Sequence, residues 1–186
     1  MVIFKKSKTM IYLLLIIISM VSNCKKDNPL KDDVLSIGKT NYTGNHVSIN
    51  GYYYKKYGTP EKLTIYLFYS NGVLLHTGDG WEHNNLNNFE QMIQSADFVN
   101  KLKGIKYAWG VFNIENNVIK FERWYPSDPP LKAYVRAGEI LNDTTFMITE
   151  SYRMYDGKKT EVHSKNEIYH FKQFSHKPDS TNNFVE

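Results

Sequence analysis

Short segments that alternate in polarity, joined by turn residues, recur along most of this chain and constrain its fold more than any other feature. The first pair is Leu63–Tyr69 and Val73–Thr77, on either side of Asn71-Gly72. Asn-Gly favours a type I′ turn because both central residues need positive φ. A two-residue loop would place Leu67 opposite His76. In that register one face carries Leu63, Ile65, Leu67, Tyr69, Leu74 and His76.

Three more hairpins are predicted farther along the chain. Their segments are Tyr107–Ile114 and Val118–Tyr125 around Asn116-Asn117, Lys132–Leu141 and Thr144–Tyr152 around Asn142-Asp143, and a last turn at Asp156-Gly157 that leads into Thr160–Phe174. Successive hairpins of this kind predict an antiparallel up-and-down sheet. The expected fold class is therefore all-β with one helix, built as a closed or nearly closed barrel over residues 46–176. A β-sandwich is the alternative.

The second hairpin sorts its residues onto two faces. Pairing across its turn puts Phe112 opposite Phe121, and Arg123 continues the same face. The other face carries Trp109 opposite Trp124. We expect the first face to form the core.

The one helical pattern covers Leu86–Lys103, where apolar residues recur at helical spacing. Gly104 is suited to the position after the last turn. Ser95 is a residue type that favours the start of a helix, so a break near it is a further possibility.

A basic start and a short apolar run precede the only cysteine of the chain. Three lysines lie within the first eight residues, and the apolar run Met10–Val21 is 12 residues long. A membrane-spanning helix needs roughly 20 apolar residues. The pattern therefore predicts a secretory signal peptide over residues 1–23.

The end of this leader, Val21-Ser22-Asn23-Cys24, resembles the lipobox of bacterial lipoproteins, and the Cys-Lys-Lys-Asp start is similar to lipoproteins of the Bacteroidota. The resemblance implies that the leader is removed and that Cys24 carries acyl chains such as palmitate. It also implies a protein of the cell envelope, anchored to the outer membrane and facing the periplasm or the cell surface. Residues 24–45 are then expected to be a flexible tether and residues 177–186 a polar tail.

The strand rhythm also resembles lipocalin-like and related small-barrel lipoproteins, in the run Trp109–Ile114 followed by Val118–Phe121. The ending Phe171–Thr181 looks like the C-termini of uncharacterised Bacteroidota lipoproteins. By fold-level analogy, these resemblances imply non-catalytic binding of a small apolar or amphipathic ligand. The alternatives are an interaction module of an envelope complex and, with the least support, an enzyme.

Composition narrows the classes of partner. The net charge of +4 falls to about +1 once the leader, with three lysines and no acid, is removed, so no basic surface for nucleic acid is expected. An acylated Cys24 leaves no disulfide and no thiol nucleophile. The chain has no phosphate-binding loop and no nucleophile elbow, and no cofactor is expected.

Four side chains on the expected inner faces are candidates for ligand binding. His76 and Arg123 could hold an anionic headgroup inside a closed barrel, and Phe112 and Phe121 could line an apolar cavity beside them. A carrier of this kind needs a cavity of about 300 Å³ or more. The alternative is that His76 bonds to a neighbour, Arg123 extends to the rim, and the side chains fill the barrel.

Trp109 and Trp124 form, with Tyr107 and Tyr125, an aromatic strip on the expected outer face. Such a strip could stack sugars or bind a partner as an exposed patch. The alternative is that the helix over residues 86–103 packs against it.

Two weaker signals lie in loops and in the tail. Asp79, Glu82 and His83 surround Trp81, but their spacing fits no particular metal, and no metal site is predicted. Thr144 and Ser180 each follow an aspartate in a pattern similar to that of O-glycosylated exported Bacteroidota proteins.

Overall fold

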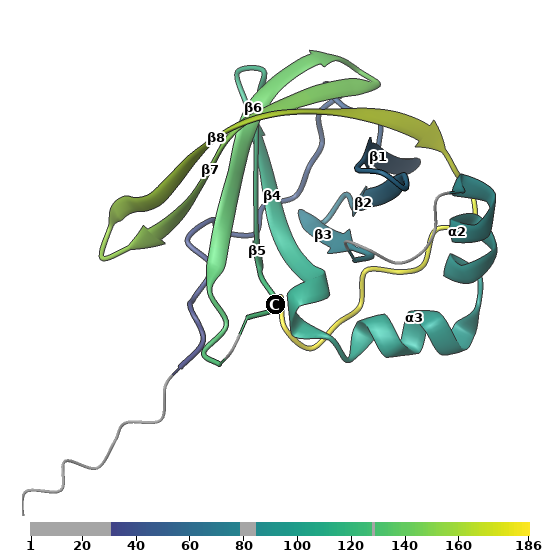
Figure 1. Cartoon of the computed structure of the whole chain (residues 1–186), viewed down its shortest axis with the longest axis horizontal. Helices are drawn as coiled ribbons and strands as arrows, with labels where there is room; N and C mark the ends of the chain where they lie inside the picture. The colour runs from purple at the N-terminus through teal and green to yellow at the C-terminus, as the bar shows by residue number, and fades with distance from the viewer. Residues whose placement is uncertain (1–30, 79–84, 128) are drawn as a thin grey trace, which may run out of the picture. The chain divides into compact units, whose positions relative to one another are not determined.

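Eight strands close into one antiparallel barrel in a computed structural model that describes residues 31–78, 85–127 and 129–186 (Figure 1). Each strand pairs with the next, and β8 returns to β1. The strands are β1 (Gly51–Tyr57), β2 (Lys62–Phe68), β3 (Val73–His76), β4 (Trp109–Glu115), β5 (Val118–Trp124), β6 (Ala133–Asn142), β7 (Thr145–Tyr155) and β8 (Lys158–Gln173). The predicted up-and-down barrel is confirmed, and the alternative β-sandwich is wrong.

The β4–β5 hairpin has the register that the sequence predicts. Asn116 and Asn117 have φ of 47° and 68°, which is the backbone of a type I′ turn. Phe112 therefore pairs with Phe121, and Gly110 pairs with Arg123. Phe112, Phe121 and Arg123 all face the interior, as expected.

The register predicted for the β2–β3 hairpin is wrong by one residue. Of the two central turn residues only Gly72 has positive φ, and the amide nitrogen of Tyr69 donates to the carbonyl oxygen of Val73. The loop therefore has three residues and ends in a glycine with positive φ, a common alternative to the two-residue turn. His76 consequently pairs with Tyr66 instead of Leu67, and it faces the interior.

Aromatic side chains fill one half of the interior, and we call them the aromatic layer. Its members are at most 1% exposed, and they are Tyr53, Tyr66, Phe68, Phe112, Phe121, Phe146 and Tyr169. The ring centroids of Phe68 and Phe112 lie 4.8 Å apart, as do those of Tyr66 and Phe121. This half of the barrel is packed by its own side chains.

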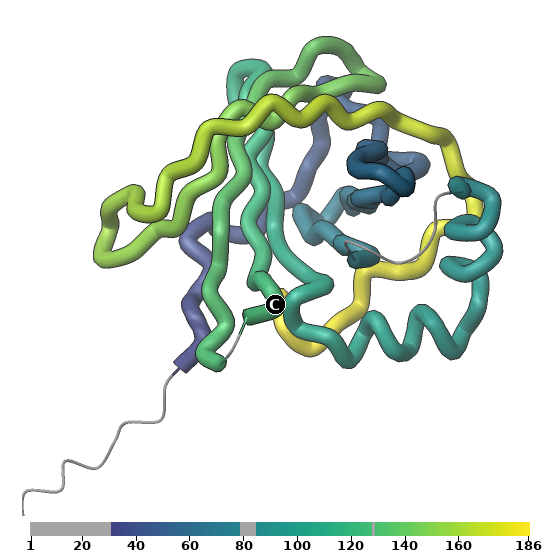
Figure 2. The backbone as a smooth tube through the Cα atoms, in the orientation of Figure 1, coloured from purple at the N-terminus to yellow at the C-terminus, as the bar shows by residue number. Residues whose placement is uncertain are grey.

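Two short helices cover the outer face of β1–β3 (Figures 1 and 2). The predicted helix 86–103 is divided into α2 (Leu86–Ile93) and α3 (Ala96–Lys103), with Ser95 as the N-cap of the second, so the suggested break is confirmed. A short 3₁₀ helix, η1 (Lys106–Ala108), leads into β4. Phe89, Ile93 and Leu102 of the two helices are buried in this second core.

The end of the chain packs against the same helices. Figure 2 shows the last residues, in yellow, beside α3. Lys103 Nζ lies 2.9 Å from a carboxylate oxygen of Asp179, and Phe184 packs against the outer core. The predicted polar tail is therefore held against the barrel domain.

Residues 32–45, which we call the strap, are bound to the barrel wall, so the prediction of a flexible tether is wrong for them. Asp33 forms an ion pair with Arg153 of β7, and Ser36 bonds to Glu122 of β5. Tyr42 packs on Phe112 with the ring centroids 5.7 Å apart. The prediction fails because these partners come from distant strands. Residues 24–30 lie outside the described residues.

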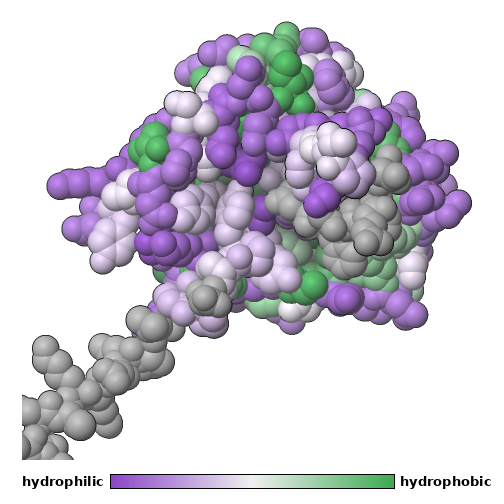
Figure 3. All heavy atoms as spheres, viewed as in Figure 1, coloured by the Kyte–Doolittle hydropathy of each residue, from purple (hydrophilic) through white to green (hydrophobic). Residues whose placement is uncertain are grey.

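The face in Figure 3 is mostly hydrophilic, with separate hydrophobic spots. Within residues 31–78, 85–127 and 129–186, none of the helices has the length and apolar character needed to cross a bilayer.

Candidate ligand site in the barrel interior

The interior has a second half, opposite the turns at residues 69–73 and 116–117, that is lined by polar groups. We call it the polar layer, and it consists of Lys55, His76, Arg123, Tyr125, Arg136 and Glu167. These residues share the inward face because they continue the alternation of the aromatic layer along each strand. Tyr66 and Tyr169 lie where the two layers meet.

Arg136 and Glu167 form the centre of the polar layer. Arg136 Nη1 is in direct contact with Glu167 Oε2, and Arg136 Nε donates to the hydroxyl of Tyr125 at 2.7 Å. Lys55 Nζ lies 3.0 Å from the other oxygen of Glu167. The side chains of Arg136, Glu167 and Lys55 are 13%, 17% and 19% exposed, so this network can be reached from solvent.

Arg123 is only 1% exposed, so it does not extend into solvent at the rim. Its Nη1 donates to the carbonyl oxygens of Tyr107 and Trp124, at 3.2 and 3.0 Å, and its guanidinium lies 3.9 Å from the ring centre of Tyr125. Gly110, the partner of Arg123 on β4, lets the backbones of β4 and β5 approach closely at this point. A Cβ at Gly110 would meet the carbonyl oxygen of Glu122 at 2.1 Å.

His76 is 3% exposed, and its ring packs against that of Tyr66 with the centroids 4.8 Å apart and the planes tilted by 34°. The structure thus places His76 and Arg123 in the same half of the barrel. Phe112 and Phe121 lie in the other half and help to fill it, as the alternative of a self-filled barrel held, so the described residues leave no deep apolar cavity around these two rings.

The electrostatics of the polar layer favour anions. Burial acts to raise the pKa of Glu167, but the positive charges of Arg136 and Lys55 outweigh it and hold that pKa below its ordinary value. Among the described residues of this layer, Lys55, Arg123 and Arg136 are the basic side chains, and Glu167 is the acidic one. Sequence patterns missed Lys55, Arg136 and Glu167, because they come from three separate strands.

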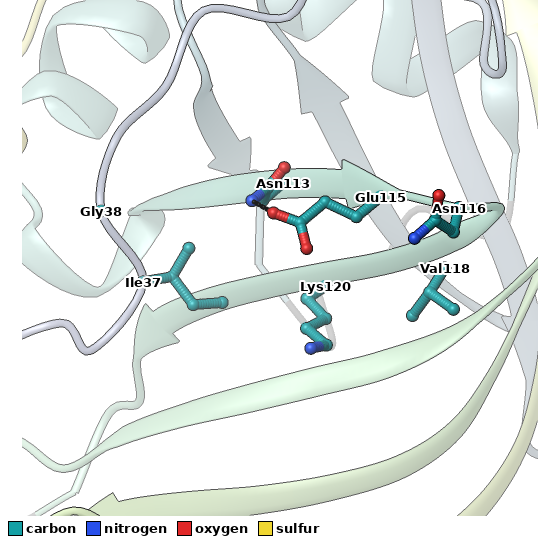
Figure 4. A pocket seen from close by; sticks show the side chains of 7 residues that line it. All are labelled: Ile37, Gly38, Asn113, Glu115, Asn116, Val118 and Lys120. Carbon is teal, nitrogen blue, oxygen red and sulfur yellow. Dashed lines mark hydrogen bonds between the residues drawn. The ribbon is translucent and has the colours of Figure 1, made fainter.

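A groove of about 440 Å³ lies outside the barrel, between the strap and the β4–β5 hairpin (Figure 4). Its lining residues are Ile37, Gly38, Asn113, Glu115, Asn116, Val118 and Lys120. A smaller hollow of about 250 Å³ lies between residues 40–46 of the strap region and β4, where Phe112 contributes to its lining. Neither could be predicted, because the sequence contains no signal that brings the strap to this wall.

The predicted exposed patch of Trp109 and Trp124 is wrong, since the two residues are 1% and 5% exposed. Trp109 Nε1 donates to the carbonyl oxygen of Leu102 in α3, at 2.9 Å. Trp124 Nε1 donates to the carbonyl oxygen of Asp33 in the strap, at 2.7 Å. The helix covers one indole, as the alternative held, and the strap covers the other.

The other predicted sites lie at the margins of the barrel or outside the described residues. Thr144 is exposed, whereas Ser180 is half-buried and its Oγ accepts a hydrogen bond from Asn71 Nδ2 at 3.0 Å. Cys24 and the loop with Asp79, Glu82 and His83 are not among the described residues. In the part of the chain that is described, no cluster of three or more His, Cys, Asp or Glu residues could hold a metal ion.

Comparison with known proteins supplies no relative from which an activity could be carried over. No protein-family model, curated protein or solved structure matches this chain.

Proposed function

We propose that this chain is a lipid-anchored protein of the cell envelope whose barrel binds a small anionic or amphipathic ligand without catalysis. The observation that carries the proposal is the polar layer, in which Lys55 and Arg136 share one carboxylate, that of Glu167. An entering anion would meet two cations that share a single carboxylate, at side chains that are mostly buried and so less screened by water than surface charges.

The aromatic layer limits the size of such a ligand. Phe121 and Phe146 are fully buried and occupy the space that a long acyl chain would need. A ligand is therefore limited to a headgroup that the partly exposed side chains of the polar layer can contact, and the packed interior has no room for a whole lipid tail.

The lipid anchor rests on the resemblance of the Cys24 segment to a lipobox. The intact mass of the membrane-extracted protein tests it. Loss of residues 1–23 together with a diacylated Cys24 supports the proposal, and a free thiol with the leader retained would contradict it.

Ligand binding is tested with a matched set of eight-carbon amphiphiles followed by NMR. Octanoate and octyl phosphate should shift the signals of Lys55 and Arg136, while octylamine should not, because the layer carries excess positive charge. The double variant Arg136→Gln with Glu167→Gln keeps a neutral hydrogen-bonded pair and should weaken the binding of octanoate.

A change at the outer groove, Lys120→Gln, is the control and should leave octanoate binding unchanged. Equal binding of octanoate and octylamine, or binding that survives the double variant, would contradict the proposed site.

A second candidate is an interaction module that binds an envelope partner through the outer groove. The supporting observation is the open groove with its paired donors and acceptors, where Asn113 Nδ2 donates to Glu115 Oε1 at 2.9 Å. Loss of partner capture in Lys120→Gln, with octanoate binding unchanged, would favour this candidate.

A further inference from the structure

We infer that the outer groove and the smaller hollow beside it form one binding site for a neutral oligosaccharide, on the outside of the barrel. The inference rests on the second candidate function, whose partner it names by its chemistry, and it is independent of the anion site proposed for the interior. Three observations carry it, namely the way the two depressions meet, the side chains that they expose, and the balance of charge among those side chains.

The first observation is that the two depressions meet at one residue. Asn113 of β4 lines both the groove of about 440 Å³ and the hollow of about 250 Å³. The strap borders both, since Ile37 and Gly38 line the groove and residues 40–44 line the hollow. Figure 4 shows Asn113 on β4 and Ile37 on the strap that runs past it. We call the two adjoining depressions the trough, and their combined volume is typical of sites for small molecules, about 300–1,000 Å³.

The trough stays open because β4 is paired on one side only at this point. The residue pairs between β3 and β4 end at Val111, and among the described residues β4 pairs with β5 alone from Asn113 onward. The strap does not replace β3 there, because the amide nitrogen of Tyr42 donates to the carbonyl oxygen of Ser70 instead. Space therefore remains between the strap and the unpaired side of β4, and the hollow occupies it.

The second observation is that the trough exposes side chains that both donate and accept hydrogen bonds. They are three amides and two hydroxyls, those of Asn41, Asn113, Asn116, Thr40 and Thr43. Asn113 Nδ2 donates to Glu115 Oε1 at 2.9 Å, which leaves its second hydrogen and the other carboxylate oxygen for a ligand. Within the part of the chain that the structure describes, the side chains of Asn41 and Asn116 make no hydrogen bond. A ligand can therefore bond to these groups without breaking bonds of the fold.

The third observation is that charge is balanced across the trough. Glu115 and Lys120 supply one negative and one positive charge to the groove, and residues 40–44 of the hollow carry none. The polar layer of the interior, in contrast, has three basic side chains and one acidic one. The trough therefore favours a neutral ligand rich in hydroxyls, because each hydroxyl both donates and accepts, as the surrounding amides do.

Apolar surface beside these groups matches the faces of a sugar ring. Val118 is 37% exposed and Ile37 is half-buried, and both line the groove. The ring of Tyr42, which packs on Phe112, lines the hollow. A sugar ring presents C–H groups on its faces and hydroxyls at its edge, so it can contact both kinds of surface at once.

A protein segment fits the trough less well than an oligosaccharide. A peptide that adds as a strand needs a free edge, and β4 offers one over only the three residues from Asn113 to Glu115. A peptide that binds through an anchor side chain needs a buried apolar pocket. The aliphatic side chains of the groove are those of Ile37 and Val118, and the second of these is exposed. The observations therefore favour the oligosaccharide.

Nitrogen-15 NMR of the full-length protein, in a detergent without a sugar headgroup, tests the inference. The side-chain amides of Asn41, Asn113 and Asn116 give signals of their own, so binding is observed at the trough itself. The neutral probes are maltohexaose, laminarihexaose, mannohexaose and N-acetylchitohexaose. Hexagalacturonate is the anionic comparison, and the uncharged peptide acetyl-Ala-Ser-Gly-Thr-Ser-Ala-amide represents a protein segment.

At least one neutral hexasaccharide should shift the signals of the three amides at about 10 mM or below, without shifting that of Asn166, an exposed residue of β8. Asn113→Ala should weaken this binding about tenfold, because it removes hydrogen bonds in both depressions. Asn41→Ala changes an exposed residue outside the sheet and should weaken binding several-fold. Asn166→Ala is the matched control and should change it by less than about twofold.

Absence of shifts with all four neutral hexasaccharides would overturn the inference, and so would binding that is unchanged in both Asn113→Ala and Asn41→Ala. Shifts caused only by the peptide or by hexagalacturonate would overturn it in favour of a protein or an acidic partner and leave the second candidate function intact. Octanoate binding in the interior should be the same in all three variants, so the outcome here is distinguishable from failure of the anion site.

Discussion

Arg153 of β7 donates from Nη2 and Nε to the two carboxylate oxygens of Asp33, at 2.6 and 2.7 Å, although 120 positions separate these residues in the sequence. Their side chains are 17% and 18% exposed. This pair joins a segment that resembles a linker to the longest hairpin of the barrel. The strap is therefore part of the folded domain.

The Asp33–Arg153 pair should show measurable coupling. The planar guanidinium meets the carboxylate with two parallel bonds and partial burial, so a double-mutant cycle with Asp33→Ala and Arg153→Ala should give a coupling free energy of about 1–3 kcal/mol. Chemical denaturation of the four proteins measures it. The exposed pair of Lys56 and Glu61 is the control and should couple by less than about 1 kcal/mol. Coupling no larger than in the control would contradict the role of the pair.

Two substitutions of Glu122 should separate the effect on stability of losing a hydrogen-bond acceptor from the effect of losing a charge. Glu122→Ala leaves the amide nitrogens of Ser36 and Ile37 without an acceptor and should destabilise the protein by about 1–3 kcal/mol. Glu122→Gln keeps an acceptor and should cost less.

The ionisation of Glu122 should also make the free energy of unfolding depend on pH, with a definite sign. Burial raises the pKa of Glu122 above 4.5, with Asp33 facing it as a further negative charge. Between the ordinary and the raised pKa the folded state binds more protons than the unfolded state, so stability falls as pH rises through this window. In Glu122→Gln this fall in stability should be absent, as measured by denaturation curves taken at several pH values. An unchanged pH profile would contradict the assignment.

The aromatic layer should be intolerant of truncation. Phe121 is 0% exposed, and its ring lies within 4.8 to 6.3 Å of the rings of Tyr66, Phe68 and Phe146. Phe121→Ala should lower the free energy of unfolding by about 3–5 kcal/mol, because the cavity cannot collapse in a closed barrel. Val118→Ala, at an exposed position of the same strand, should change it by less than about 0.5 kcal/mol. Similar effects of the two changes in thermal and chemical denaturation would show that this layer is not packed.

Lys177 should titrate well below other lysines. Burial lowers its pKa to about 8, although its ammonium donates to the carbonyl oxygens of Ile49 and Phe68 and lies 4.1 Å from the ring centre of Tyr69. Carbon-13 NMR of the lysine ε position measures the titration. A midpoint above about 10, the usual value for lysine, would contradict the burial of the charge.

The free energy of unfolding should change with pH as Lys177 loses its proton. Between about 8 and the ordinary pKa of 10.5 the unfolded state binds more protons than the folded state, so stability rises as pH increases through that window. Lys177→Met should remove this rise from denaturation curves, and a rise that persists in the variant must come from another group.

Local sequence predicted those parts of the fold that are made by neighbouring residues. Asn116 and Asn117 both accept positive φ, so the β4–β5 register followed from two adjacent residues. The break before α3 likewise followed from Ser95. The β2–β3 register did not follow, because Asn-Gly fits both a two-residue loop and the observed three-residue loop.

Periodicity predicted that His76 and Arg123 would face inward, yet it could not show what they meet there. Arg136 and Glu167 lie 31 positions apart and come together only when the barrel closes. Trp109 and Trp124 were correctly placed on the outer face, but their burial depends on α3 and the strap, which reach them from elsewhere in the chain.

By itself, the sequence predicted every strand except β1, most of the turns and, outside the β2–β3 hairpin, the faces of the side chains, because turn chemistry and two-residue alternation are local. Tertiary structure alone decided that the barrel closes over a filled aromatic layer, that cations gather at its other end, and that residues 32–45 bind to its wall. Those features depend on contacts between residues far apart in the chain. Such contacts stabilise the protein only once folding has brought the distant strands side by side, so no local pattern predicts them.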